Sequence, residues 1–87
     1  MELELSFQIM PDSHLVGMTL EELEKRYDIR IPHKYRIDAD TKSIEDAMIF
    51  NRRAKINAGE YITAVGEYKK VSSFGCEANK TENKRRN

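Results

Sequence analysis

Apolar and polar residues alternate without a break from Glu2 to Ile9, and this pattern restricts the fold more than any other feature of the chain. The odd-numbered positions from Leu3 onward are apolar, and the even-numbered positions are polar. A period of two residues predicts a strand with one face against a core and the other in solvent. Because the chain has only 87 residues, we expect this strand to belong to one small domain.

A short helix is predicted shortly after this strand. Met10–Ser13 contains a proline and turn-forming residues, so the strand should end there. Thr19 and Glu22 have the spacing of a capping box, in which each side chain binds the backbone N–H of the other residue. Apolar residues then recur at helical spacing, which predicts a helix over Leu20–Tyr27.

Alternation returns from Ile29 to Ile37 and predicts a second strand. One predicted face carries Ile29, Ile31, His33, Tyr35 and Ile37, and the other carries Arg30, Pro32, Lys34 and Arg36. Pro32 has no N–H to donate, which indicates an edge strand, a bulge, or a strand that ends early.

The middle of the chain is ambiguous. Residues 38–43 are polar and predict a loop. Ser43–Asp46 resembles a weak capping box and favours a helix, whereas Met48–Phe50 would also form a short strand. The basic residues at 52–55 are expected to form surface ion pairs with the acidic residues of 38–46.

The C-terminal third predicts a turn, a strand and a helix. Gly59 supplies the positive φ of the turn, and Tyr61–Val65 is rich in strand-forming residues. Gly66 is expected to end that strand and release the chain into a helix over Glu67–Phe74, with Gly75 as the residue that follows the helix. The folded domain would then span 1–76, and residues 77–87 would be a disordered polar tail.

Composition excludes several classes of protein. The chain has 15 Lys+Arg and 15 Asp+Glu, so its net charge predicts neither nucleic-acid binding nor attachment to an anionic membrane. No apolar run approaches the ~20 residues of a membrane span, and the acidic N-terminus is unlike a signal peptide. Cys76 is the single cysteine, so we expect no disulfide and no zinc site.

The predicted order is strand-helix-strand-strand-strand-helix, with the ambiguous segment taken as a strand. This order indicates the α+β class, with a small mixed or antiparallel sheet of about four strands and two helices.

Two segments resemble the RCK C-terminal domain, also called the TrkA C-terminal domain. Ser13–Leu20 (SHLVGMTL) matches its turn and helix start, and Ala58–Gly66 (AGEYITAVG) matches its later "Ala-Gly-Asp" turn and strand. In this pattern Gly17, Thr19, Gly59 and Gly66 are the structural turn and cap positions. The chain departs from the family at Glu60, where aspartate is usual, at Pro32, and in a longer loop over residues 38–46.

The resemblance implies a cytoplasmic, ligand-sensing regulatory domain of a channel or transporter, for potassium in most members. Such domains pair as homodimers, here expected through Leu20–Tyr27 and the strand that follows it, and they gate transport when a small ligand binds. In one subset the ligand is cyclic di-AMP. The chain would be a separate subunit or the excised soluble tail of a membrane protein. The alternative is a purely structural dimerisation module of a transporter such as a chloride channel, without a ligand.

The candidate ligand-binding residues lie on the second strand: Arg30, His33, Lys34 and Arg36. Guanidinium and ammonium groups match phosphate oxygens, so a basic row could hold a phosphate-bearing ligand. The plainer interpretation is that the basic residues are solvated and that His33 is a partly buried residue with a structural hydrogen bond. We expect no catalytic residues, because Ser13 and His14 are adjacent and point apart. We expect no metal, because His33 could pair only with His14 and no metal-ligand spacing is present. We expect no nicotinamide or ATP, because the GxGxxG fingerprint is missing.

Overall fold

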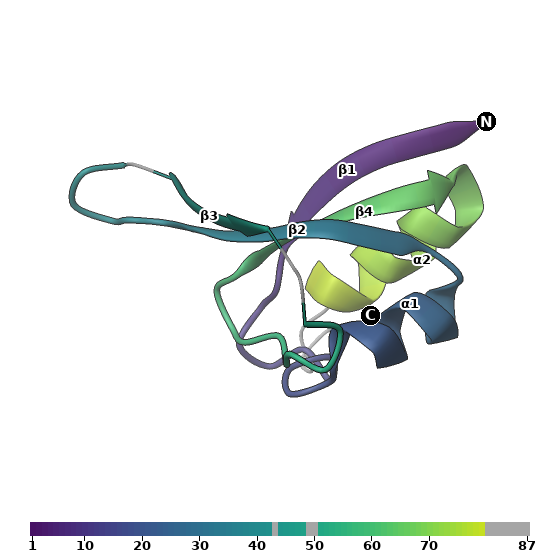
Figure 1. The fold of residues 1–87 in the computed structure, drawn as a ribbon, viewed down its shortest axis with the longest axis horizontal. Coiled ribbons are helices and arrows are strands. Elements are labelled where there is room, and N and C mark those ends of the chain that lie inside the picture. The colour runs from purple at the N-terminus through teal and green to yellow at the C-terminus, as the bar shows by residue number, and fades with distance from the viewer. Residues whose placement is uncertain (43, 49–50, 80–87) are drawn as a thin grey trace, which may run out of the picture.

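An antiparallel sheet with both helices on one of its faces makes up the fold (Figure 1). The computed structural model describes residues 1–42, 44–48 and 51–79, and only the backbone of 44–48. The elements are β1 (Glu2–Gln8), α1 (Leu20–Tyr27), β2 (Arg30–Ile37), β3 (Ile44–Met48), β4 (Tyr61–Glu67) and α2 (Tyr68–Asn79). The predicted class, a small α+β domain with an antiparallel sheet and two helices, is confirmed.

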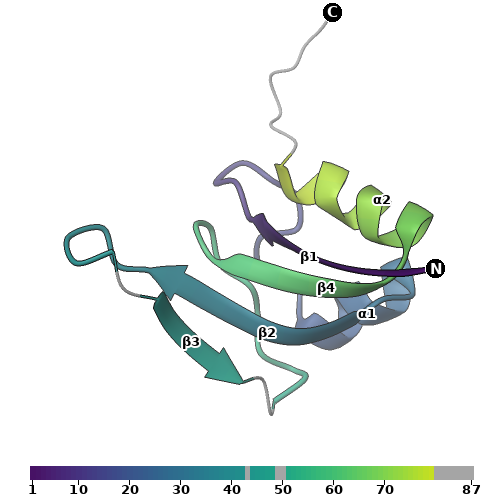
Figure 2. The ribbon, with the colours of Figure 1, turned by 90° about the horizontal axis from the view of Figure 1, so that it is seen from above.

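The sheet is built around β4, which pairs with β1 on one side and β2 on the other. β3 pairs with the second half of β2, so the order across the sheet is β1-β4-β2-β3 (Figure 2). Ile44–Met48 is therefore extended, and the helix considered for this segment is wrong. The strand considered for Met48–Phe50 reaches past the described residues, because 49 and 50 lie outside them.

α1 begins and ends where its local sequence predicts. Thr19 Oγ1 accepts a hydrogen bond from the Glu22 N–H at 3.2 Å, and the Thr19 N–H donates to Glu22 Oε1 at 2.8 Å. This second bond is the main reason that the pKa of Glu22 is lowered. The helix ends at Asp28, which adopts a left-handed conformation with φ 55°.

Phe74 joins the helices to the sheet at the centre of the core. Its ring is fully buried, and it makes edge contacts with Phe7 of β1 at 5.9 Å and with Tyr27 of α1 at 5.6 Å between ring centroids. The other fully buried large side chains are Ile9, Leu15, Leu20, Leu23, Ile31, Ile56, Ile62 and Val71.

Two glycines expected to end elements lie inside them instead. Gly66 lies within β4 and pairs with Leu3 of β1, and Gly75 is a buried residue within α2. A Cβ at Gly75 would lie 2.3 Å from the Phe7 ring, so glycine is needed there to let the ring pack against the helix backbone. The helix continues to Asn79, so residues 77–79 belong to it and not to a tail; residues 80–87 lie outside the described part of the chain.

Two turns that are distant in sequence meet below the sheet. Gly17 and Gly59 have φ values of 91° and 88°, as their predicted turns require. The Gly17 N–H donates to Ile56 O at 2.9 Å, and the Ile56 N–H donates to Met18 O at 2.9 Å. The Gly59 N–H donates to Ile9 O at 2.8 Å, which ties its turn to the end of β1.

Candidate functional site

A β-bulge in β2 decides which side chains can form a site. Arg30 pairs with Val65 and His33 pairs with Thr63, so three steps along β2 match two steps along β4. One residue is extra, and the alternation of side chains reverses at Pro32. The bulge is therefore the correct one of the three interpretations of this proline.

The single apolar face predicted for this strand is wrong beyond the bulge. Ile31 is buried on the helix side, but His33 and Tyr35 pair with Thr63 and Tyr61 on the opposite side. Lys34 pairs with Ile62, which is buried in the core, so Lys34 lies on the helix side.

A carboxylate and a guanidinium satisfy the backbone groups of the bulge. The Ile31 N–H donates to Glu24 Oε2 of α1 at 2.8 Å, and Arg52 Nη1 donates to Ile31 O at 2.8 Å. Arg52 and Glu24 are also 3.2 Å apart as an ion pair. Pro32 needs no partner for an N–H, so the bulge strands no donor at this residue. Arg52 thus pairs with Glu24 of α1 and not with the acidic residues of 38–46, where the sequence predicted its partners.

The four candidate ligand residues do not converge. Lys34 and Arg36 lie together on the helix side, beside the start of β4, where both pair with Glu60. Arg30 pairs with Glu2 at 3.1 Å and shares the opposite side of the sheet with His33. The shared face predicted for the three basic residues is therefore wrong, and only Lys34 and Arg36 form a cluster.

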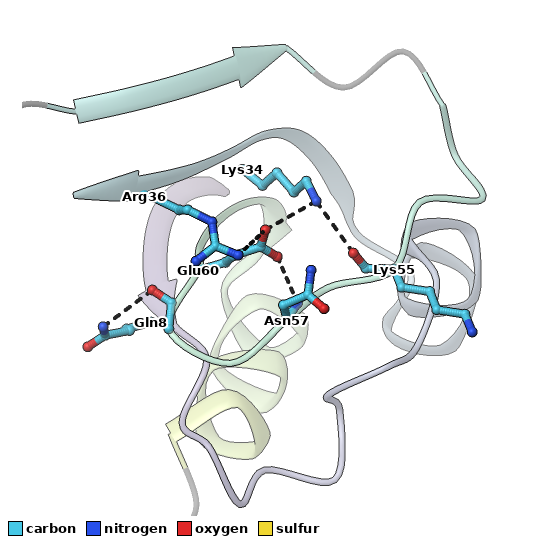
Figure 3. A network of polar contacts seen from close by, with 7 residues as sticks. Gln8, Lys34, Arg36, Lys55, Asn57 and Glu60 are labelled. Carbon is cyan, nitrogen blue, oxygen red and sulfur yellow. Dashed lines mark hydrogen bonds and ion pairs between the residues drawn. The ribbon is translucent and has the colours of Figure 1, made fainter. Parts of the chain in front are cut away.

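Glu60 is the centre of that cluster, which we call the Glu60 cluster: Lys34, Arg36, Asn57 and Glu60 (Figure 3). Glu60 Oε2 accepts from Lys34 Nζ and from Arg36 Nη2, each at 3.3 Å. Glu60 Oε1 accepts from the Asn57 N–H at 2.7 Å. The carboxylate therefore ties the loop before β4 to the far half of β2.

Burial within the Glu60 cluster is uneven. The Glu60 side chain is only 6% exposed, and that of Arg36 is 52% exposed. Lys34 is mostly buried and also donates to Lys55 O at 3.4 Å. Two cations share one carboxylate, and the half-exposed guanidinium carries the remaining positive charge toward solvent. Such a group can bind a phosphate or carboxylate oxygen of a small ligand.

Sequence reasoning missed Glu60 as a site residue, although it follows Gly59 directly in the recognised turn. The available signal was a charged residue in a turn beside two basic positions of a strand. Only the bulge brings Lys34 and Arg36 to the same side as Glu60, and the residue pattern did not fix the bulge.

The side of the sheet away from the helices carries an aromatic pair. Tyr35 and Tyr61 stack at 5.0 Å with an interplanar angle of 8°. Beside them, the Ser6 and Thr63 hydroxyls are 2.8 Å apart. In Figure 2 this side faces the viewer, with α1 behind the sheet.

Comparisons with known proteins identify no family: no protein-family model matches the chain, and no curated protein matches it. Within residues 1–42, 44–48 and 51–79, no three His, Cys, Asp or Glu side chains are grouped to hold a metal ion. Neither of the helices in these ranges has the length and apolarity to cross a membrane.

Proposed function

We propose that the chain is a regulatory domain of the TrkA C-terminal type, acting as a homodimer on the cytoplasmic side of a potassium or other ion channel or transporter. One observation carries the proposal. The two segments that resemble this family are about forty residues apart, yet the first is hydrogen-bonded to the chain directly before the second, because Gly17 and Met18 bond to Ile56. Gly17 and Gly59 have the positive φ values that the motif turns need. The element order, with β3 as the third strand of the TrkA-type pattern, also fits.

The ligand in this proposal is a small phosphate-bearing molecule that binds the exposed guanidinium of Arg36. Cyclic di-AMP, the ligand of one subset of the family, is the first candidate. Ligand phosphate would compete with Glu60 for Arg36, and the loop tied by Glu60 would respond. A ligand changes gating only by the difference in its affinity for two arrangements of the dimer. Arg30 and His33 are not part of this site, because they lie on the other side of the sheet.

Thermal unfolding with added ligand tests this function. Cyclic di-AMP, ATP and inorganic phosphate are added separately to the full chain. A ligand at a hundredfold excess over its Kd stabilises the folded state by about 2.7 kcal/mol. We expect Arg36→Ala to abolish the shift. Arg30→Ala removes the same side chain from the same strand, at 64% exposure, and should leave the shift intact.

A structural module without a ligand is the second candidate. The observation that favours it is the buried Glu60 carboxylate, which already occupies both cations of the cluster. In that case none of the ligands shifts the unfolding temperature, while the chain still sediments as a dimer. A shift that both arginine variants retain would place the ligand elsewhere and refute the Glu60 cluster as its site.

A further inference from the structure

β1 is an unpaired edge of the sheet and has exposed apolar side chains beside it. It lies first in the order β1-β4-β2-β3 and has no partner strand on its outer side among the described residues. Three of the large apolar side chains that are exposed in the described chain lie near this edge. Leu5 is in β1, Met1 directly precedes this strand, and Tyr68 begins α2. Met1 and Tyr68 border one shallow depression of about 420 Å³, together with Glu67 and Lys69. Exposed strand edges of this kind are templates for pairing with another chain.

The backbone of β1 shows which of its groups point outward. The Ile9 N–H donates to Glu60 O at 2.9 Å, toward the β4 side. Backbone groups alternate along an antiparallel strand, so the odd-numbered residues of β1 use theirs for β4. The even-numbered residues, from Glu2 to Gln8, therefore present N–H and C=O groups along the free edge.

We propose that a second copy of this chain pairs with β1 in antiparallel orientation, about a twofold axis at Leu5. This inference rests on the homodimer of the proposed function, but it places the interface on β1 and not on α1 and β2, where the sequence analysis expected it. Centring on Leu5 aligns the whole of Glu2–Gln8 with its symmetry mate. Glu4 then lies opposite Ser6 of the second copy, with their outward backbone groups bonded, and Glu2 lies opposite Gln8 in the same way.

Charge supports this partner and this register. The acidic residues of β1 meet a hydroxyl and an amide, both of which can donate to a carboxylate, and no like charges face each other. Centring on Glu4 would instead place this carboxylate against its own copy. Leu5 is 44% exposed in the single chain, and at the axis it contacts its own copy in a non-hydrogen-bonded pair, where side chains approach closely.

The flank of α2 beside this edge carries uncharged side chains apart from Lys69 at its start. Gly75 packs on Phe7 of β1, while Lys70 and Glu77 turn toward the α1 side, where they pair with Asp28 and His14. Helical spacing then places Tyr68, Ser72 and Cys76 on the flank beside Leu5. Tyr68, Ser72 and Cys76 themselves carry no charge that pairing with a second copy would bury.

Sedimentation equilibrium of the full chain and of Leu5→Lys tests the interface. We expect Leu5→Lys to raise the dimer dissociation constant by about tenfold or more, because two like charges meet and an apolar contact is lost. Ile37→Lys is the matched control. Ile37 is 41% exposed on β2, which is separated from β1 by β4, so this variant should leave the dissociation constant unchanged. Circular dichroism verifies that both variants are folded.

Cross-linking gives an independent measurement. In a Cys76→Ser background, Leu5→Cys should form a disulfide-linked dimer on mild oxidation, because directly opposed Cβ atoms lie about 4.5–5.5 Å apart. Glu2→Cys, exposed on the same strand but three residues from the axis, should not. A dimer that survives Leu5→Lys, with no cross-link through Leu5→Cys, overturns the β1 interface and leaves the proposed function standing. A chain that stays monomeric over the whole concentration series overturns both.

Discussion

Removing the Glu24 carboxylate tests whether this side chain holds the bulge in β2. Ile31 is fully buried, and its N–H donates to Glu24 at 2.8 Å. A hydrogen bond to a charged acceptor contributes about 1.5–3 kcal/mol. The partly exposed ion pair with Arg52 adds about 0–1 kcal/mol. Glu24→Ala should therefore lower the free energy of unfolding by about 2–3 kcal/mol, and in a domain this small the Tm should fall by about 10–20 °C.

Urea denaturation and thermal unfolding, both followed by circular dichroism, measure this loss. Glu24→Gln keeps an oxygen that accepts from Ile31 and should cost only about 1 kcal/mol. Glu21→Ala, exposed on the same helix, controls for the change of helix composition. If Glu24→Ala costs no more than Glu21→Ala, the carboxylate does not hold the bulge and the reasoning is refuted.

Three further predictions concern packing, capping and pH. Gly75→Ala should destabilise the fold by about 1–3 kcal/mol, because its Cβ meets the Phe7 ring, and Phe7→Leu should recover part of the loss in chemical denaturation; a stabilised Gly75→Ala would contradict this packing. Thr19→Ala should cost about 1 kcal/mol in the same assay through the lost cap, and a loss below the error of the assay would show that the cap contributes nothing. Because the pKa of Glu22 is lowered in the folded state, its carboxylate stabilises the fold at pH values above the ordinary pKa of 4.5. This contribution is lost as the pH falls through the lowered pKa. Glu22→Gln should therefore flatten the acid limb of a plot of stability against pH, and an unchanged slope would argue against this cause.

The parts of the fold that depend on local chemistry could be predicted. Thr19 and Glu22 cap a helix through bonds within one turn of chain, so the bounds of α1 match the prediction of Leu20–Tyr27. The alternation also predicted the strand β1, Glu2–Gln8, although its apolar side is only partly buried, because Leu5 is 44% exposed.

The candidate site could be predicted only in part. Lys34 and Arg36 were selected from their charge, and they do lie together. Arg30 was selected by the same rule, but the bulge places it on the other side of the sheet. Glu60 was not selected, because its role depends on strands that meet only after folding.

The sequence by itself determined the helix cap, the two glycine turns and the class of the fold, since each rests on interactions between residues close in the chain or on simple periodicity. Tertiary structure decided where the bulge lies, because Glu24 and Arg52 reach Ile31 from separate elements. It also decided that α2 continues through Gly75, because the Phe7 ring of β1 occupies the space that a side chain at position 75 would need. Contacts between distant segments have no signature in a local pattern, and in this protein they determine which face each charge occupies.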